Sequence, residues 1–256
     1  MPDFVDIHSH VLYGLDDGAS TIDESIGMLE MARDAGTTDI VATPHADTQY
    51  AFDPERVEAR IAELSARVSG ITIHRGCDFR LEVSNIEEAL RNPTKYTINH
   101  RNYLLVEFPH MTVFPSSGGI FAQLLDAGMT PIITHPERNA FLQQNPDELT
   151  KWVEAGCLAQ VTAASCTGQF GKRVQATAHA LMQRNLVHFI ASDAHDTKNR
   201  TPDLRPAYAL LTKQWGEVRV RPLFVDNPRA VLSGREVDVW SAGPMVPAKK
   251  WYEFWR

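Results

Sequence analysis

Histidine and carboxylate side chains recur along this chain directly after short apolar runs. Ten histidines accompany only three cysteines in 256 residues. The polar groups that follow apolar runs are His8, His10, Asp16, Asp17, His45, Asp78, Glu82, Glu107, His135, Glu137, Asp193 and His195. Imidazoles mixed with carboxylates and without thiolates suit Zn²⁺, Mn²⁺ or Fe²⁺, and they argue against an iron–sulfur cluster or structural zinc. The set is too large for one tetrahedral ion and predicts two or three ions that share carboxylates.

The apolar runs themselves predict the elements that position these groups. They are nearly continuous rather than alternating, which is typical of buried parallel strands. The predicted strands are residues 4–7, 39–42, 71–75, 103–108, 130–134, 158–162 and 187–191, and the predicted helices are 22–35, 54–68, 119–127, 146–155 and 172–184. Thr21 and Glu24 have the spacing of a capping box at the start of the first helix. This alternation predicts one α/β domain with a parallel sheet.

Six of the seven predicted strands end at a His, Asp or Glu. In a parallel barrel these strand ends share one rim, where barrel enzymes place their chemistry, so a barrel fits better than an open sheet. His8 and His10 are two residues apart and are expected to project to one side. Judged jointly, the predicted metal ligands are His8, His10, His45, His135, Asp193 and His195. The histidines expected to be core or surface groups are His74, His100, His110, His179 and His188.

Two arginines follow predicted ligands at short spacing. Arg138 lies three residues after His135, and Arg200 lies five residues after His195. A guanidinium group can bind two oxygens of a phosphate at once. The alternative for each arginine is a surface salt bridge. Next to a cluster of metal ions, the pair indicates a phosphorylated substrate.

Composition narrows the class of protein further. A formal net charge of −7 makes nucleic acid a poor candidate partner, because general affinity for nucleic acid needs clustered Lys and Arg. The three cysteines are odd in number and widely spaced, so reduced thiols and a cytoplasmic location are expected. No apolar run approaches the ~20 residues that span a bilayer, and no signal peptide is recognisable. Residues 241–256 form a basic-aromatic tail, predicted either to dock on the body or to contact a partner or membrane surface.

Several motifs resemble those of a known superfamily. Four segments of this chain resemble the four motifs of the PHP (polymerase and histidinol phosphatase) superfamily. They are Asp6-Ile7-His8-Ser9-His10, Asp16-Asp17-Gly18, Thr43-Pro44-His45 and Ala191-Ser192-Asp193-Ala194-His195. A closer resemblance, over about residues 3 to 235, is to the bacterial PHP-type protein-tyrosine phosphatases of capsule and exopolysaccharide operons (the CpsB/YwqE type). It adds His135-Pro136-Glu137-Arg138, residues 190–195 and Phe224-Val225-Asp226-Asn227-Pro228-Arg229.

The resemblance implies a distorted (β/α)₇ TIM-like barrel over residues 1–240, with a trinuclear metal cluster. Mn²⁺ is the expected ion, with Fe, Zn or Mg as the other candidates. The implied ligands are His8, His10, Asp17 rather than Asp16, His45, Asp78, Glu107, His135, Asp193 and His195. Asp78 stands where the family usually has a Glu, and Glu82 is the alternative contributor. Arg138 and Arg200 match the phosphate-binding arginines, and His45 would help to hold an ion that stabilises the leaving oxygen.

The implied activity is metal-dependent hydrolysis of phosphotyrosine without a phosphoenzyme intermediate. The implied partner is the tyrosine-phosphorylated tail of a bacterial tyrosine autokinase that controls polysaccharide export. Cysteine chemistry is not expected, because the segment after Cys166 lacks the arginine that thiol phosphatases need. Three alternatives stay open: a phosphatase of a small metabolite such as histidinol phosphate, a carbon–nitrogen amidohydrolase, and a metal-stabilised regulatory module without catalysis.

Overall fold

Strands and helices alternate along the chain, as predicted. The computed structural model describes residues 2–109 and 112–239. Its strands are β1 (Phe4–Ser9), β2 (Thr37–Ala42), β3 (His45–Ala46), β4 (Thr72–Arg75), β5 (Asp78–Arg80), β6 (Tyr103–Glu107), β7 (Thr130–Thr134), β8 (Leu158–Thr162) and β9 (Phe189–Ala191). The pairs β1–β2, β2–β4, β3–β5, β5–β6, β6–β7, β7–β8 and β8–β9 are all parallel.

Two of the predicted strands are each followed, after a short break, by a further strand that was not predicted. β3 follows β2 after a break at residues 43–44, and β5 follows β4 after a break at 76–77. Pro44 has no N–H to donate to a neighbouring strand. A Cβ at Gly76 would lie 2.7 Å from Cγ1 of Val41, so this close approach needs glycine. The breaks turn the last residues of both strands, which carry His45 and Asp78.

The strands form a ring when these breaks are bridged. If β3 is counted with β2 and β5 with β4, the nine strands make seven paths. Asp78 N donates to Pro44 O (3.1 Å), which joins the path of β4 and β5 to the path of β2 and β3. On the other side, Ser9 and Ala194 form a parallel bridge, and Asp193 N donates to His8 O (2.8 Å). The predicted seven-stranded, distorted parallel barrel is therefore confirmed.

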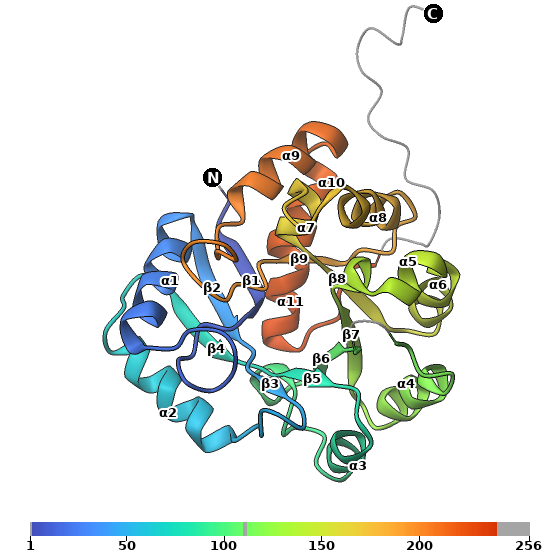
Figure 1. The fold of residues 1–256 in the computed structure, drawn as a ribbon, viewed down its shortest axis with the longest axis horizontal. Helices are drawn as coiled ribbons and strands as arrows, with labels where there is room; N and C mark the ends of the chain where they lie inside the picture. The colour runs from blue at the N-terminus through green and yellow to red at the C-terminus, as the bar shows by residue number, and fades with distance from the viewer. Residues whose placement is uncertain (1, 110–111, 240–256) are drawn as a thin grey trace, which may run out of the picture.

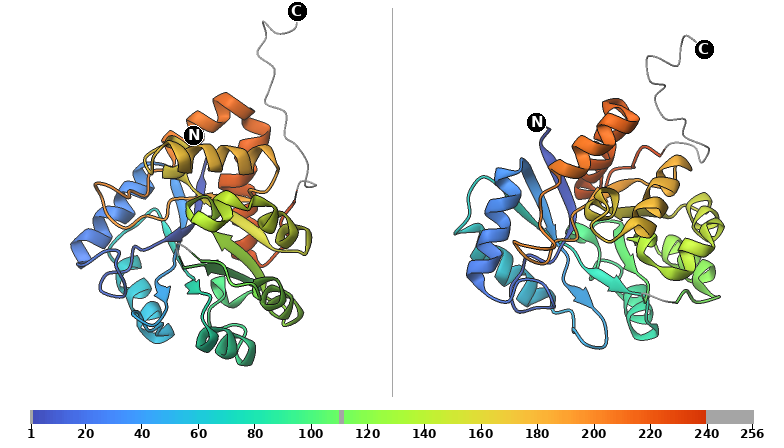
Figure 2. Two further views of the ribbon diagram at one scale, coloured as in Figure 1. Left: turned by 45° about the vertical axis from the view of Figure 1, so that its right-hand side comes forward. Right: turned by 45° about the horizontal axis from the view of Figure 1, so that its top comes forward.

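The helices lie outside the ring of strands, except for one that crosses an end of it (Figures 1 and 2). The outer helices are α1 (Ile22–Asp34), α2 (Pro54–Ser65), α3 (Val83–Arg91), α4 (Ser117–Asp126), α5 (Ala140–Gln144), α6 (Pro146–Glu154), α7 (Ala163–Thr167), α8 (Lys172–Gln183), α9 (Arg205–Trp215) and α10 (Glu217–Arg221). The remaining helix, α11 (Asn227–Ser233), packs across the amino ends of the strands. Its Leu232 O accepts a hydrogen bond from Asn99 Nδ2 (3.1 Å).

The interior of the ring is apolar from the amino ends of the strands to their middle. Buried side chains from six strands and from α11 form one cluster there, which includes Val5, Ile7, Val41, Leu105, Ile132, Leu158, Phe189, Ala230 and Val231. Burying large aliphatic and aromatic side chains contributes roughly 1.5–3 kcal/mol each before the loss of conformational entropy is counted. The amino end of the barrel is therefore a packed core that holds the ring together.

The structure corrects several details of the predicted elements. Boundaries of predicted strands and helices move by up to three residues, and α3, α5, α7, α9, α10 and α11 were not predicted. In α9, the buried Ala207, Leu211 and Trp215 are spaced four apart, which is a helical signal. The capping box is half right: Thr21 Oγ1 accepts from Glu24 N (3.2 Å), but the Glu24 carboxylate accepts from Ser20 N (2.9 Å) rather than Thr21 N.

Three smaller expectations also have outcomes. Cys77, Cys157 and Cys166 are buried and unpaired, as expected. No helix among the described residues is both long and apolar enough to span a bilayer. The predicted tail at 241–256 lies outside the described residues.

Candidate metal centre

The first strand supplies two imidazoles to the carboxyl rim of the barrel. Asp6 pairs with Ile40 but Ser9 pairs with Ala42, so β1 holds one extra residue relative to β2 in this stretch. Such a bulge re-aims side chains and is common next to functional sites. The Nε2 atoms of His8 and His10 lie 3.3 Å apart, so the two imidazoles do project to one side.

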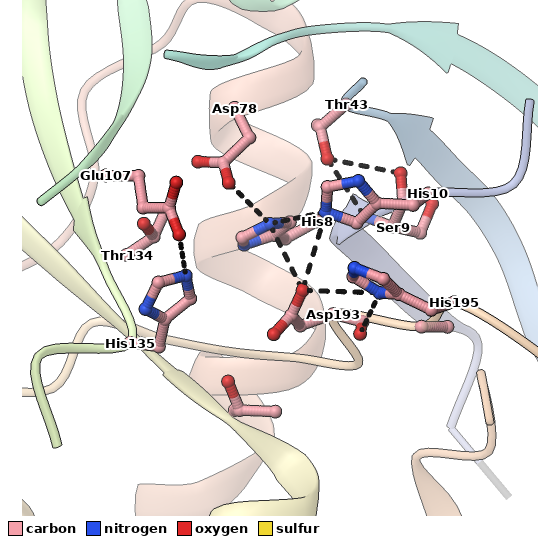
Figure 3. Close-up of polar contacts among 12 residues, drawn as sticks. His8, Ser9, His10, Thr43, Asp78, Glu107, Thr134, His135, Asp193 and His195 are labelled. Carbon is pink, nitrogen blue, oxygen red and sulfur yellow. Dashed lines mark hydrogen bonds and ion pairs between the residues drawn. The ribbon is translucent and has the colours of Figure 1, made fainter. Parts of the chain in front are cut away.

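The predicted ligands from different strands converge on these imidazoles (Figure 3). Three overlapping groups have ligand atoms that all lie within 4.8 Å of one another: His10, Asp17, His45 and His195; His8, His10 and Asp78; and His45, Asp78 and Glu107. The groups share His10, His45 and Asp78. Shared ligands are what a site for more than one ion requires, as the residue count had indicated.

The remaining two predicted ligands join the same cluster. His135 Nε2 lies 3.5 Å from Glu107 Oε1, and Asp193 Oδ1 lies 3.5 Å from Nε2 of His8. His135 and Asp193 have positive φ values of 34° and 53°, in a left-handed region that residues other than glycine rarely adopt. Such strained backbone is concentrated at functional sites. All nine predicted ligands thus lie within one connected set of contacts.

Several buried polar atoms of this cluster lack a hydrogen bond. They are both carboxylate oxygens of Asp78, Oε2 of Glu107 and Nδ1 of His45. Asp78 Oδ2 is 3.2 Å from His45 Nδ1 without hydrogen-bonding geometry. Buried polar atoms without partners are costly, and most proteins satisfy them. Orphaned oxygens and nitrogens of this kind fit divalent cations, which would supply the missing partners.

Burial and neighbouring charges set the protonation of these groups. Burial raises the pKa of Glu107 to about 7, and repulsion from Asp78 adds to the effect. Burial, together with the charge of Arg138, holds the pKa of His135 well below its usual range. A neutral imidazole is the form that binds a metal ion. Two carboxylates close together in a buried place favour a cation between them.

Asp16 and Gln160 support the cluster and were not predicted to do so. Asp16 Oδ2 accepts a hydrogen bond from His10 Nδ1 (2.6 Å), and Gln160 Oε1 accepts from His8 Nδ1 (2.8 Å). Hydrogen bonds of this kind fix the orientation and tautomer of a ligating imidazole. Asp16 was visible in the sequence as part of Asp-Asp-Gly. Gln160 carried no local signal because it lies 152 residues from His8.

The structure also shows which carboxylate enters a ligand group where the sequence offered two, Asp16 or Asp17 and Asp78 or Glu82. Asp17 Oδ1 lies 3.3 Å from His45 Nε2, so Asp17 is the carboxylate of Asp-Asp-Gly that enters a ligand group. A Cβ at Gly18 would lie 2.2 Å from His10 O, which explains why glycine follows. Asp78 lies in the cluster, whereas Glu82 stands at the N-cap of α3 and enters no ligand group among the described residues.

Both predicted arginines reach the cluster from one side. Arg138 Nη1 and Arg200 Nη2 each form an ion pair with Oδ2 of Asp193. The two guanidinium groups line a cavity of about 310 Å³, together with Asp17, His45, Asp47, Gln49, Tyr50, Arg80, Glu107, His135, Asp193 and His195. This volume lies at the small end of the range of roughly 300–1,000 Å³ for ligand pockets.

Four residues of the cavity wall were not predicted: Asp47, Gln49, Tyr50 and Arg80. Arg80 Nη2 forms an ion pair with Glu107 Oε2 (3.0 Å) that lacks hydrogen-bonding geometry. A usable signal existed, because Arg80 follows Asp78 by two residues and Tyr50 follows His45 by five, close to the offsets of Arg138 and Arg200.

The other histidines do not enter these ligand groups. His188 Nδ1 accepts a hydrogen bond from Ala159 N (3.0 Å), and His179 Nε2 lies 3.1 Å from Cys166 O. His74 pairs with Asp39 (2.9 Å), and His100 lies 2.7 Å from a guanidinium nitrogen of Arg75. His110 lies outside the described residues. Each of the four described histidines therefore has a partner outside the three ligand groups.

Comparison with known proteins assigns the family. A family model described as "Capsular polysaccharide synthesis, CpsB/CapC" matches residues 4–233. The chain belongs to the CpsB/CapC family. It is 34% identical over 255 residues to a putative tyrosine-protein phosphatase CapC of Staphylococcus aureus, covering 97% of this chain and 98% of that protein. It is 36% identical over 238 residues to the tyrosine-protein phosphatase YwqE of Bacillus subtilis, covering 91% and 93% of the two chains.

Solved structures agree with this membership of the CpsB/CapC family. One solved structure superposes on this chain with a TM-score of 0.88. It belongs to a study of Bacillus subtilis YwqE and Streptococcus pneumoniae CpsB, which are described there as unique metal-dependent tyrosine phosphatases. That structure is 31% identical and covers 96% of this chain and 100% of that one. A dihydropyrimidinase from Brevibacillus agri reaches a TM-score of 0.56 at 11% identity, covering 98% of this chain and 74% of its own, which shows a shared fold alone. The resemblance inferred from the motifs is thus confirmed.

For a CpsB/CapC family member, this arrangement has a clear chemical capacity. The cavity is lined by imidazoles and carboxylates suited to divalent cations and by three guanidinium groups, those of Arg80, Arg138 and Arg200. Cations and arginines together can bind a dianionic phosphate, although the chain as a whole carries a formal charge of −7. The positive charge that a phosphate needs is supplied locally.

Proposed function

We propose that this chain is a metal-dependent protein-tyrosine phosphatase that hydrolyses a phosphotyrosine monoester directly with water. The observation that carries the proposal is that His45 and Glu107, which have buried atoms without hydrogen bonds, line one cavity together with Arg138 and Arg200. Asp78, whose carboxylate oxygens also lack hydrogen bonds, lies directly behind His45, with Oδ2 3.2 Å from His45 Nδ1. The tyrosine phosphatases CapC and YwqE, which match this chain nearly end to end, support it.

Nine residues would hold the metal: His8, His10, Asp17, His45, Asp78, Glu107, His135, Asp193 and His195. When bound, two or more divalent ions lower the pKa of water and offset charge on phosphoryl oxygens. Mn²⁺ is the ion we propose, on the strength of the family resemblance, whereas nitrogen and carboxylate ligands without thiolates suit Zn²⁺, Mn²⁺ and Fe²⁺ alike. Asp78 is one methylene shorter than the Glu usual in the family, and it still comes within 4.8 Å of ligand atoms in two groups.

The arginines bind the phosphate and stabilise the charge that develops during transfer. Arg138 and Arg200 both contact Asp193 Oδ2, so an ion bound by that carboxylate would leave their guanidinium groups facing a phosphate. Fixed donors aimed at developing charge supply most of the rate in phosphoryl transfer. His45, between Asp17 and Asp78, would help to hold the ion nearest the leaving phenolate. With a pKa near 10, a phenolate is an easier leaving group than an alkoxide.

We further propose that the substrate is the tyrosine-phosphorylated tail of a bacterial tyrosine autokinase that regulates capsule or exopolysaccharide synthesis. The support is the family, whose description names capsular polysaccharide synthesis. The barrel alone does not select a substrate. The cytoplasm is the proposed location, in keeping with three buried, unpaired cysteines.

We propose that residues 1–240 act as one catalytic barrel and that the basic-aromatic tail at 241–256 either docks its aromatic residues on the barrel or contacts a membrane surface or partner. The tail holds Lys249, Lys250, Trp251, Tyr252, Phe254, Trp255 and Arg256. Cationic and aromatic side chains in one segment suit an anionic interface.

The decisive experiment measures phosphate release from a phosphotyrosine peptide by the full chain. We expect release with Mn²⁺, none after complete removal of metal with EDTA, and recovery when metal is restored. Separate additions of Mn²⁺, Fe²⁺, Zn²⁺ and Mg²⁺ rank the ions. Undiminished release from metal-free protein would overturn the mechanism. Faster release from histidinol phosphate than from the peptide would favour a small-metabolite phosphatase instead.

A further inference from the structure

One wall of the candidate cavity contains four residues that have no role in the metal and phosphate binding proposed above. Asp47, Gln49, Tyr50 and Arg80 line this wall, and none belongs to a ligand group. They come from the loop after β3 and from the end of β5, two neighbouring parallel strands. The loop wall, as we name these four residues, is therefore built on rigid strand ends.

The loop wall is tied together by the carboxylate of Asp47. Its Oδ1 accepts hydrogen bonds from the backbone N–H groups of Gln49 and Tyr50, both at 2.8 Å. Asp47 N donates in turn to Tyr50 O (3.0 Å). Asp47 Oδ2 lies 3.5 Å from Arg80 Nη2. Asx turns of this kind hold a short loop in one conformation, so the backbone of Tyr50 is fixed.

The Tyr50 ring lies nearly parallel to the ring of His45, a proposed metal ligand. Its plane is inclined by 19° to the His45 ring, with 6.0 Å between the ring centroids. Gln49 Nε2 donates to the Tyr50 hydroxyl (3.0 Å), so the hydroxyl already has a partner. Tyr50 is half-buried, which leaves part of the ring surface accessible.

The cavity is otherwise polar. Eleven of its twelve lining residues carry a charged, imidazole or amide side chain, and Tyr50 is the exception. A phosphate held by Arg138 and Arg200 must leave the rest of its ester group against the remaining walls. The ring of an aryl ester gains free energy from an apolar, aromatic contact, and an alkyl group of a small metabolite gains much less. Among the lining residues, Tyr50 alone carries a benzene ring, and the other aromatic rings are the imidazoles of the proposed metal ligands His45, His135 and His195.

We propose that Tyr50 is a specificity-determining residue that contacts the aromatic ring of the phosphotyrosine substrate, with Asp47 as its positioning residue. This inference rests on the proposed function, because it assumes that an aryl phosphate binds in this cavity. It explains how a cavity with almost no apolar surface distinguishes an aryl ester from an alkyl ester.

The chain offers a matched control at another tyrosine of the same rim. Tyr13 lies in the loop after β1, but it does not line the cavity. Its hydroxyl donates to Glu63 Oε2 (2.8 Å), and the Arg60 guanidinium lies 4.0 Å from its ring centroid. Tyr13 and Tyr50 are therefore both tyrosines in loops after strands, and only Tyr50 lines the cavity.

The test compares two non-hydrolysable ligands, phenylphosphonate and methylphosphonate, which share the anionic group and differ in the ring. Their dissociation constants for the Mn²⁺-loaded full chain are measured by calorimetry, so the result does not depend on turnover. We expect the preference for the phenyl ligand to fall about tenfold in Tyr50→Ala. It should change less than about twofold in Tyr50→Phe and in Tyr13→Ala. Asp47→Asn should lower it less than Tyr50→Ala does.

Two results would overturn the inference. One is a Tyr50→Ala protein with the same preference as the unaltered chain. The other is an unaltered chain that binds both phosphonates equally. The proposed function fails separately, when a phosphotyrosine peptide loses no phosphate in the presence of metal. A chain that keeps its Tyr50-dependent preference but does not hydrolyse the peptide would therefore refute the function and leave the aryl-binding wall in place.

Discussion

The two ends of the barrel are built from the same seven strand paths and have opposite chemistry. The carboxyl rim gathers imidazoles, carboxylates and arginines, and several of their buried atoms lack hydrogen bonds. The amino end is filled by apolar side chains such as Ile7, Leu105 and Phe189, and α11 crosses it. This difference indicates that the amino end stabilises the fold, while the rim keeps an arrangement that is unfavourable without a ligand.

One pair of histidines makes the comparison concrete. Burial lowers the pKa of both His135, at the rim, and His188, at the amino end. His188 Nδ1 accepts a hydrogen bond from Ala159 N, and Asn227 Nδ2 donates to His188 O (3.0 Å). His135 Nε2 instead lies 3.5 Å from Glu107 Oε1, and its side chain lines the cavity. The same residue type is structural at one end and available to a ligand at the other.

The largest effect is expected from Glu107→Gln at the rim. We expect activity with Mn²⁺ to fall about 1,000-fold, because divalent ions contribute several kcal/mol to charge stabilisation and each 1.4 kcal/mol is tenfold in rate. The metal-free protein should gain about 1 kcal/mol in free energy of unfolding, since a buried carboxylate beside Asp78 is removed. Urea unfolding in EDTA measures this gain. A clear loss in the free energy of unfolding would show that the rim stabilises the fold. That result would contradict the proposed difference between the two ends of the barrel.

A second rim substitution, Arg138→Lys, should lower the rate about 100-fold, the usual cost of one lost donor to developing charge. Lysine keeps the charge but not the planar fork that binds two oxygens. The measurements are kcat and KM on a phosphotyrosine peptide, and the loss should fall mainly on kcat. Arg184→Lys, at a surface ion pair with Asp147, is the control and should change neither constant. Equal losses in both variants would contradict a specific role for Arg138.

The smallest effect concerns stability at the amino end and comes from His188. Burial lowers the pKa of His188 to about 4 in the folded chain, against about 6.5 when unfolded. At pH values between about 4 and 6.5 the unfolded chain therefore binds more protons at His188 than the folded chain does. The free energy of unfolding is unaffected by His188 above about pH 6.5 and decreases as the pH falls toward 4. From pH 7 to pH 5, His188 should account for about 2 kcal/mol of lost stability.

The measurement for His188 is denaturant unfolding at pH 7 and pH 5 in EDTA, with His188→Gln as the comparison. The rim groups titrate in both proteins, so the difference between the proteins isolates His188. We expect the free energy of unfolding to fall between pH 7 and pH 5 by about 2 kcal/mol less in His188→Gln than in the unaltered chain. Identical pH dependence in the two proteins would mean that His188 is not held neutral by the fold.

Much of the site could be predicted because it follows strand ends. Apolar runs identify buried strands, and the polar residue that ends each run must lie on the shared rim of a parallel barrel. His8, His45, Glu107 and His135 were found in this way, without any knowledge of contacts. The residue types then limited the metal to those that nitrogen and oxygen ligands prefer.

The sequence by itself thus determined the class of fold, the rim and the kinds of ligand, because these depend on local periodicity and on residue chemistry. Only the tertiary structure decided that Asp16 orients His10, that Gln160 orients His8, and that Tyr50 faces the cavity. Neighbouring residues share the same local sequence pattern. Bulges, strand breaks and turns then decide which of their side chains points into the site. Those features arise from packing between segments that lie far apart in the chain.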